Sequence, residues 1–194
     1  MKIALFGATG MVGSRIATEA TGRGHQVTAL SRSTGEDLAD ADAVRRAAAH
    51  HDVVVSATGP SRTGESHQPW LDAVSTLIAH SEEARVLFVG GAGSLLTPDG
   101  TRLLDSEGFP EEYKSEATSG AAALDLFRAA PASLDWTFVS PAPVIAPGER
   151  TGTYATALDT PAGDFISAED YAVALVDEIE QPQHRRQRFT AATA

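Results

Sequence analysis

Glycines at three-residue spacing follow the first apolar run of the chain. The run covers residues 2–6, and the segment Gly7-Ala8-Thr9-Gly10-Met11-Val12-Gly13 comes directly after it. In such a segment Gly7 lets the chain turn off a strand, Gly10 lets a pyrophosphate approach the backbone, and Gly13 lets a helix pack close to the sheet. Free N–H groups at the start of that helix point at the phosphates, with the positive end of the helix dipole behind them. The spacing predicts a dinucleotide-binding loop whose contacts are Gly7, Thr9, Gly10, Met11, Val12 and Gly13.

The surroundings of this loop match a βαβ unit. A helical pattern continues to about residue 21, Gly22-Arg23-Gly24-His25 provides a helix stop, and a second strand is expected over residues 26–30. A glycine triplet alone is equally typical of an ordinary strand-to-helix turn. The strand before the loop and the helix after it favour dinucleotide binding.

The end of the second strand bears on the choice of cofactor. NAD-binding proteins usually place an acidic residue here, which accepts hydrogen bonds from the adenosine ribose. This chain has Leu30-Ser31-Arg32-Ser33 instead. An arginine between serines suits the 2′-phosphate of NADP(H) through charge-assisted hydrogen bonds. We therefore expect NADP(H) to contact Arg32 and Ser33, with Arg15 as a further contributor; the alternatives are NAD(H) as cofactor and solvated surface arginines.

Three further segments are expected near the cofactor because ligands bind at the carboxyl ends of parallel strands. Asp37 and Leu38 fall where the chain should pass the adenine, and Ala57, Thr58 and Gly59 follow the apolar run 53–55, although a plain strand-ending turn explains the last three equally well. The polar loop 60–69 is long enough to cover the nicotinamide half. His67 within it either reaches the substrate or is an exposed loop histidine.

Apolar runs alternate with helical patterns along the whole chain. Strands are expected over residues 52–57, 85–91, 136–139 and 188–191, and helices over residues 41–50, 70–80, 111–130 and 168–180. The alternation predicts one α/β domain over residues 1–194, a Rossmann-like doubly wound and mostly parallel sheet. Only residues 31–40 separate the second strand from the next helix, so the usual third strand, at the edge of the sheet, is expected to be lost or vestigial.

Composition excludes several classes of function. The chain has 194 residues, a formal net charge of −11 at pH 7 and no cysteine. A chain of this length buries roughly 70% of its unfolded surface, which is enough for one core. The negative charge argues against nucleic-acid binding, the histidines show no metal-ligand spacing, and no apolar run is long enough to cross a membrane. We expect a cytoplasmic monomer or homodimer whose partner is a small-molecule acceptor.

Several motifs, in order along the chain, resemble the atypical short-chain dehydrogenase/reductases. Among these, the chain is most similar to the NAD(P)H-binding group of NmrA-like proteins and NADH-flavin reductases. The resemblance implies a Rossmann-like fold and a nicotinamide cofactor. It is carried by residues 7–13, Ser31-Arg32, Val89-Gly90-Gly91-Ala92-Gly93-Ser94, Asp135-Trp136-Thr137, Ser140-Pro141-Ala142, Pro147-Gly148-Glu149-Arg150-Thr151-Gly152 and Ile166-Ser167-Ala168-Glu169-Asp170-Tyr171-Ala172.

The main branch of that family uses a Tyr-x-x-x-Lys pair and a serine, and this chain departs from the pattern. Ser94 and Tyr113 occupy plausible positions, but Ala117 stands four residues after the tyrosine. The neighbouring Lys114 would point about 100° away around a helix. Catalytic residues are therefore unassigned, with Ser94 and Tyr113 as the candidates.

Hydride transfer to a flavin, a quinone or a similar flat acceptor makes smaller demands, because the protein chiefly has to stack two rings. We predict this activity, with flavin as a substrate rather than a bound group. The resemblance places Pro141 at the nicotinamide, and the substrate region is expected over residues 94–113 and 144–164. The alternative function is a non-catalytic NADP(H) sensor of the NmrA-like type. The cluster Arg185-Arg186-Gln187-Arg188 predicts a solvated turn.

Overall fold

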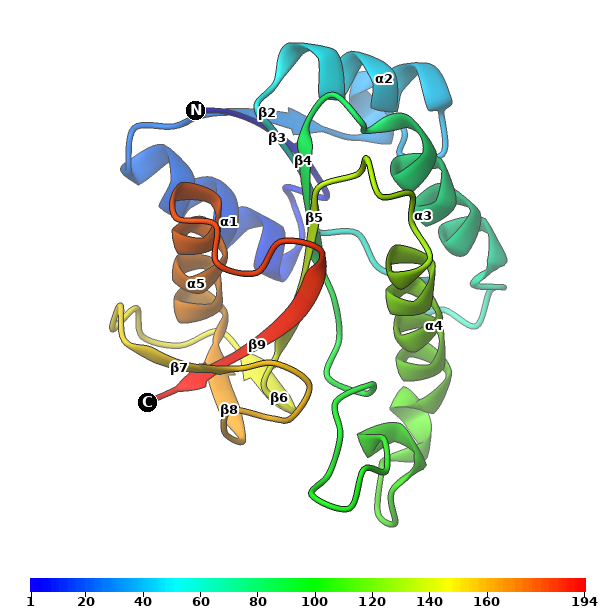
Figure 1. The fold of residues 1–194 in the computed structure, drawn as a ribbon, viewed down its shortest axis with the longest axis vertical. Coiled ribbons are helices and arrows are strands. Elements are labelled where there is room, and N and C mark those ends of the chain that lie inside the picture. The colour runs from blue at the N-terminus through cyan, green and yellow to red at the C-terminus, as the bar shows by residue number, and fades with distance from the viewer.

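The apolar runs of the sequence form the strands of one seven-stranded sheet. The computed structural model, which describes residues 1–194, gives the strand order β2-β1-β3-β4-β5-β9-β7, and all neighbours pair in parallel except β7 with β9 (Figure 1). The strands are β1 Lys2–Phe6, β2 Gln26–Leu30, β3 Val53–Ser56, β4 Arg85–Val89, β5 Trp136–Pro141, β7 Tyr154–Ala157 and β9 Gln187–Thr193. The carboxyl ends of the parallel strands consequently share one edge of the sheet.

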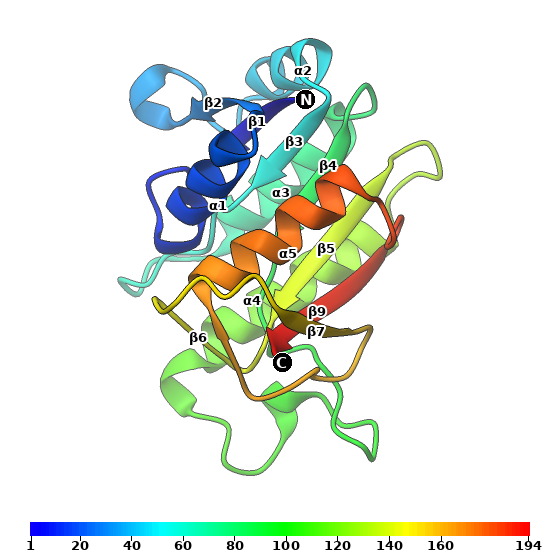
Figure 2. The same cartoon turned by 90° about the vertical axis from the view of Figure 1, so that its left-hand side faces the viewer.

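Helices cover both faces of the sheet, as the predicted doubly wound fold requires. α1 (Met11–Gly22) and α5 (Ala168–Glu180) pack together on one face and lie in front of the sheet in Figure 2. α2 (Ala41–His50), α3 (Gln68–His80) and α4 (Glu111–Arg128) cover the other face. No helix combines the length and the apolar character needed to cross a membrane.

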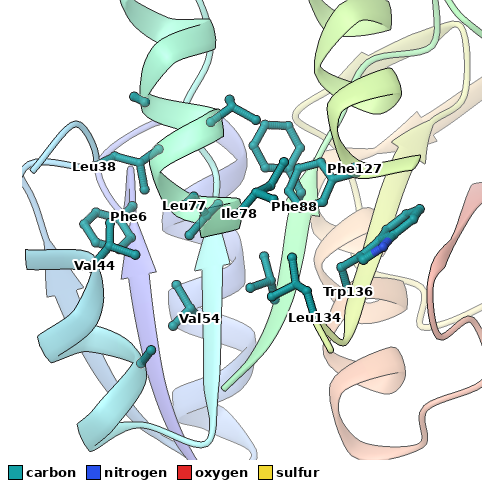
Figure 3. Close-up of a cluster of buried hydrophobic side chains, with 14 of the residues drawn as sticks. Phe6, Leu38, Val44, Val54, Leu77, Ile78, Phe88, Phe127, Leu134 and Trp136 are labelled. Atoms are coloured by element: carbon teal, nitrogen blue, oxygen red, sulfur yellow. The ribbon is translucent and has the colours of Figure 1, made fainter. Parts of the chain in front are cut away.

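Each face of the sheet has its own apolar core, because successive side chains of a strand point to opposite faces. Phe6, Phe88 and Phe127 belong to the cluster under α2, α3 and α4 (Figure 3). Leu38 lies in the same cluster and is only 5% exposed. The other cluster joins the remaining strand residues to α1 and α5 and includes the fully buried Tyr171.

The expected loss of the third strand is confirmed. β2 forms one edge of the sheet, and the segment that would supply a further strand contains only the short 3₁₀ helix η1, Arg32–Thr34. Its first turn is closed by reciprocal bonds between Ser31 and Thr34, and Gly35 follows with a φ of +78°. No further strand therefore covers β2 at this edge of the sheet.

The sequence analysis missed the short strands after β5. β6 (Val144–Ala146) and β8 (Phe165–Ser167) form a separate two-stranded parallel sheet, and β7 lies between them in the chain. Strands of three or four residues are too short to show a period. The 3₁₀ helix η2 (Leu103–Asp105) was also missed, and α3 begins at Gln68 rather than residue 70, because Pro69 fits the first turn of a helix.

Candidate functional site

The glycine loop between β1 and α1 is held by close backbone contacts. Gly7 has a φ of +81°, and a Cβ there would lie 2.5 Å from the carbonyl oxygen of Ala57 at the end of β3. A Cβ on Gly13 would lie 2.1 Å from the carbonyl oxygen of Gly7. Both glycines are therefore required by the packing of the loop itself, as the sequence predicted for them.

The amino end of α1 offers hydrogen-bond donors without partners. Gly10 is the N-cap and supplies no side-chain bond, while the N–H groups of Met11, Val12 and Gly13 have no acceptor within the protein. A Cβ on Gly10 would meet only the carbonyl oxygen of Gly7, at 3.5 Å. The first turn carries no acidic side chain that would repel a phosphate. Donors, helix dipole and open space fit an anionic pyrophosphate.

The neighbouring strands extend this site along the carboxyl edge of the sheet. Gly59 after β3 and Gly91 after β4 are exposed, and a Cβ on either would meet no atom within 4 Å. Thr58 lies beside Gly59; its hydroxyl contacts that of Ser56 at 3.0 Å and accepts a hydrogen bond from the indole of Trp70 at 3.3 Å. The backbone around Gly59 and Gly91 is thus exposed beside the hydroxyl of Thr58, which hydrogen bonds hold in place. We call this exposed backbone the open shelf.

Arg32 differs from every other arginine of the chain. Its guanidinium has no hydrogen-bond or ion-pair partner and it is exposed just after the edge strand β2. The side chains of Ser31 and Ser33, on either side, bond to each other at 2.8 Å. Each of the other arginines donates to a carboxylate, a carbonyl, a hydroxyl or an imidazole. Arg32 is therefore the free cation of this site.

The structure turns two other sequence candidates away from the open space. Arg15 donates to Glu169 of α5 at 2.9 Å and to the carbonyl of Met11 at 3.0 Å, so its guanidinium is engaged on the α5 side of α1 rather than toward β2. The side chain of Leu38 is committed to the core, and Asp37 accepts from the N–H of Ala39 at 3.0 Å. Leu38 therefore offers only its backbone to an adenine, whereas the half-buried Asp37 keeps a carboxylate oxygen without a partner.

The structure does not bring together the two candidates for catalysis. The hydroxyl of Ser94 is buried and accepts from the guanidinium of Arg188 at 3.0 Å. Tyr113 is 58% exposed at the start of α4, and its hydroxyl makes no hydrogen bond. No contact joins the two residues, and neither has a lysine partner. A tyrosine–lysine–serine site is therefore not assembled here.

Arg188 corrects the prediction that the arginine cluster is a solvated turn. It is only 4% exposed, because the strand β9 carries it across the sheet; its guanidinium pairs with Asp159 as well as Ser94. The N–H of Leu96 donates to the carbonyl of Asp159 at 2.8 Å. Asp159 thus brings together the two segments that the sequence predicts as the substrate region, residues 94–113 and 144–164. Periodicity alone could not distinguish Arg188 from its solvated neighbours.

Pro141 ends β5 at the carboxyl edge, and its side chain is buried. Its carbonyl accepts from the hydroxyl of Thr190 at 3.2 Å. The preceding residue, Ser140, has a buried hydroxyl without a partner. Pro141 therefore lies at the edge where a nicotinamide would be expected, on a strand fixed by its neighbours on both sides.

His67 is neither exposed nor unpartnered, contrary to the simpler of the two expectations for it. It is half-buried at the start of α3, and its two ring nitrogens contact the hydroxyl of Ser119 at 2.8 Å and the carbonyl oxygen of Ser61 at 2.9 Å. Arg62 of the same loop pairs with Glu116 of α4. The loop 60–69 is thus fastened to α4 at two points, which the sequence did not indicate.

Comparisons with known proteins agree with this geometry. Residues 7–182 match the model of a family described as NAD(P)H-binding. The chain is 38% identical to "Uncharacterized protein YwnB" of Bacillus subtilis, covering 100% of this chain and 99% of that one. Among solved structures, a "putative exported protein" of Burkholderia pseudomallei is 47% identical with a TM-score of 0.89 and 99% of both chains covered. A "putative NADH-flavin reductase" of Streptococcus pneumoniae is 36% identical with a TM-score of 0.85 and 100% of both chains covered.

Proposed function

The chain belongs to the NAD(P)H-binding family, and from this premise we propose that it is an NADPH-dependent oxidoreductase that reduces a flavin, a quinone or a similar flat acceptor. The Streptococcus pneumoniae relative carries the name of a flavin reductase, which supports the choice of acceptor. When bound, the cofactor would supply the hydride. Flavin is a diffusible substrate in this proposal rather than a resident group, and the protein acts as a monomer or homodimer.

The proposal rests on two features observed together. The start of α1 has backbone N–H groups without an acceptor, and the guanidinium of Arg32 has no partner in the protein. The N–H groups of Met11, Val12 and Gly13 would hold the pyrophosphate. Arg32 would neutralise the 2′-phosphate of NADPH, because no carboxylate of the protein competes for its guanidinium. The charge-assisted contact favours NADPH over NADH.

The residues at the nicotinamide end support ring stacking more than tyrosine-assisted carbonyl chemistry. Tyr113 lacks a lysine, and the hydroxyl of Ser94 is engaged with Arg188. The exposed backbone of Gly59 and Gly91 leaves open space at the carboxyl ends of β3 and β4. Positioning two planar rings at reacting distance is then the main contribution of the protein.

Binding and turnover measured together test this function. We expect calorimetry to show NADPH binding in preference to NADH, and NADPH oxidation at 340 nm to accelerate with at least one member of a panel of FMN, FAD and naphthoquinones. A non-catalytic sensor, the alternative function, would bind NADPH with comparable affinity and turn over none of these acceptors.

We also propose a cytoplasmic location. The oxidised cofactor leaves the protein after each turnover, so other enzymes in the same compartment must reduce it again. The name of the Burkholderia relative points to export instead. Fractionation of cells producing a tagged chain compares the two locations directly.

A further inference from the structure

A serine and a histidine from distant parts of the chain form a hydrogen-bonded pair beside the proposed site. The Nδ1 atom of His67 lies 2.8 Å from the hydroxyl oxygen of Ser119, and the Nε2 atom lies 2.9 Å from the carbonyl oxygen of Ser61. Ser119 is 9% exposed and His67 is half-buried. Both nitrogens of the ring are therefore oriented by the protein.

The partners determine where the protons are. A carbonyl oxygen only accepts, so Nε2 must carry a proton and donate it to Ser61. In the neutral ring Nδ1 then accepts from the hydroxyl of Ser119. In the charged ring Nδ1 donates to the oxygen of Ser119, which leaves the hydroxyl proton free to point elsewhere. The pair accommodates both charge states without moving a heavy atom.

The pair joins the start of α3, which follows β3, to α4, which follows β4. His67 ends the loop that follows Gly59 of the open shelf, and β3 and β4 are neighbours in the sheet. Two residues before Ser119, Ala117 packs against the loop after β4, since a Cβ on Gly93 would lie 2.6 Å from that of Ala117. Immediately after Ser119, a Cβ on Gly120 would meet no atom within 4 Å. The position next to Ser119 on α4 thus faces open space.

We propose that Ser119 and His67 form a proton relay to the acceptor. This inference rests on the proposed function and narrows the acceptor to one whose oxygen or nitrogen gains a proton as its ring gains the hydride. The O–H bond of Ser119 breaks toward that atom as the acceptor receives two electrons from NADPH. The Nδ1–H proton of His67 moves to the oxygen of Ser119, and the neutral ring takes its next proton from water. NADPH, one proton and the acceptor become NADP⁺ and the reduced acceptor.

Charged groups on the surrounding elements leave the pair in a nearly neutral setting. Arg62 of the loop and Glu116 of α4 neutralise each other through two hydrogen bonds of 3.1 and 2.7 Å. Asp72 of α3 accepts from the side chain of Gln68 at 2.8 Å. The other titratable groups on these elements are exposed, apart from the half-buried His80; they are Glu65, Glu111, Glu112, Tyr113, Lys114, Asp125 and Arg128.

The variant His67→Gln distinguishes a role of His67 in proton transfer from a role in fastening the loop 60–69 to α4. In His67→Gln the amide can still donate to Ser61 and accept from Ser119, but it cannot carry a proton to them. We expect turnover with a naphthoquinone to fall at least about a hundredfold, as for loss of a general acid, with NADPH affinity unchanged. Ser119→Ala should show the same loss. His51→Gln is the matched control, because His51 also bonds one carbonyl and one hydroxyl but lies at the amino end of the sheet.

The pH dependence of turnover gives a second test, because a residue that only fastens the loop to α4 would not change it. Turnover of the wild type should fall as pH rises over about pH 5 to 9, because the relay starts from the charged imidazole ring. His67→Gln should lose this dependence and His51→Gln should keep it. Nitrogen-15 NMR of the ring in the free protein should show the Nε2–H tautomer in the neutral state.

Two failures are distinguishable. If the wild type reduces the quinone and His67→Gln does so within about threefold at the same pH dependence, the relay is wrong and the proposed function stands. If the wild type reduces no acceptor, the proposed function and the relay both fall. A wild-type turnover that does not fall with rising pH over this range also overturns the relay.

Discussion

At the residue scale, the glycines of the nucleotide loop differ in what a side chain would meet. A Cβ at Gly13 would lie 2.1 Å from a backbone oxygen, whereas one at Gly10 lies in ordinary contact at 3.5 Å. Gly13→Val should therefore destabilise the fold by about 1–3 kcal/mol or more through overpacking. Gly10→Val should leave the unfolding midpoint nearly unchanged but abolish NADPH binding, because its side chain occupies the place of the pyrophosphate.

Urea unfolding and calorimetry of the two variants measure both effects. A folded Gly10→Val protein that binds NADPH with wild-type affinity would refute the loop as the cofactor site.

Arg32 determines the expected preference for NADPH. One charge-assisted hydrogen bond contributes roughly 1.5–3 kcal/mol, or about ten- to a hundredfold in affinity. Arg32→Ala should weaken NADPH binding by that factor and leave NADH binding unchanged. Arg46→Ala is a suitable control, since this nearby arginine is paired with Glu36. The selectivity argument fails if the ratio of the two dissociation constants is the same in Arg32→Ala and the wild type.

Tyr113 should be dispensable for chemistry. Its side chain is 58% exposed, and its hydroxyl has no hydrogen-bond partner that could orient it. Tyr113→Phe should therefore keep most of the single-turnover rate of NADPH oxidation with a flavin between about pH 6 and 9. A loss of a hundredfold, typical of a general acid, would restore tyrosine-assisted carbonyl reduction as the leading mechanism.

At the element scale, segment 147–152, which follows β6, is bonded to the helix after the glycine loop and to α5. Arg150 forms two hydrogen bonds of 2.7 Å with Glu19 of α1. The N–H of Gly148 donates to Glu169, and Gly152 donates to Asp170, both in the first turn of α5. α1, α5 and this segment therefore form one hydrogen-bonded unit.

The acid stability of this unit should depend on Glu19. The hydrogen bond from Arg150 outweighs burial and, with a second bond from Arg23, lowers the pKa of Glu19 from 4.5 to about 2. A carboxyl with a depressed pKa stabilises the fold above its unfolded pKa and loses that contribution as pH falls toward the folded value. Glu19→Gln should thus be less stable than the wild type at pH 7, and the difference should shrink between about pH 4.5 and 2.

Urea unfolding at several pH values measures this difference. A constant gap between Glu19→Gln and the wild type across that window would show that the charge of Glu19 contributes nothing.

At the scale of the whole molecule, a buried ion pair and the proposed cofactor site lie at opposite ends of the strands. At the amino ends of β4 and β5, the buried carboxylate of Glu178 accepts from Arg85 at 2.5 Å and from the backbone and ring of His184. Burial would raise the pKa of Glu178, but the hydrogen bonds from His184, Arg85 and Gln183 lower it overall. The open shelf around Gly59 and Gly91, the proposed cofactor site, lies at the carboxyl ends of the strands.

Glu178→Gln should therefore reduce stability without reducing affinity. Breaking a buried ion pair leaves Arg85 without its counterion and costs about 3–5 kcal/mol, measured as a shift in the urea midpoint. The dissociation constant of NADPH for the folded variant should equal that of the wild type. A weaker affinity would show that the two ends of the sheet are coupled.

The sequence by itself determined the central sheet, the glycine loop and the loss of the third strand. These features are local: strand periodicity, glycine spacing and the ten residues between β2 and α2 each act within one segment of the chain. Arg32 belongs with them, because its position follows directly from the end of β2. The short strands β6, β7 and β8 were missed because three or four residues are too few to show a period.

Only the tertiary structure decided which side chains meet. It buried Arg188 against Ser94, turned Arg15 toward Glu169 and joined His67 to Ser119. Residues 94, 154 and 52 positions apart in the chain come into contact because of the strand order and the packing of helices on the two faces. No periodic pattern records such pairings, since they depend on which strands become neighbours and on how side chains pack once the sheet has formed.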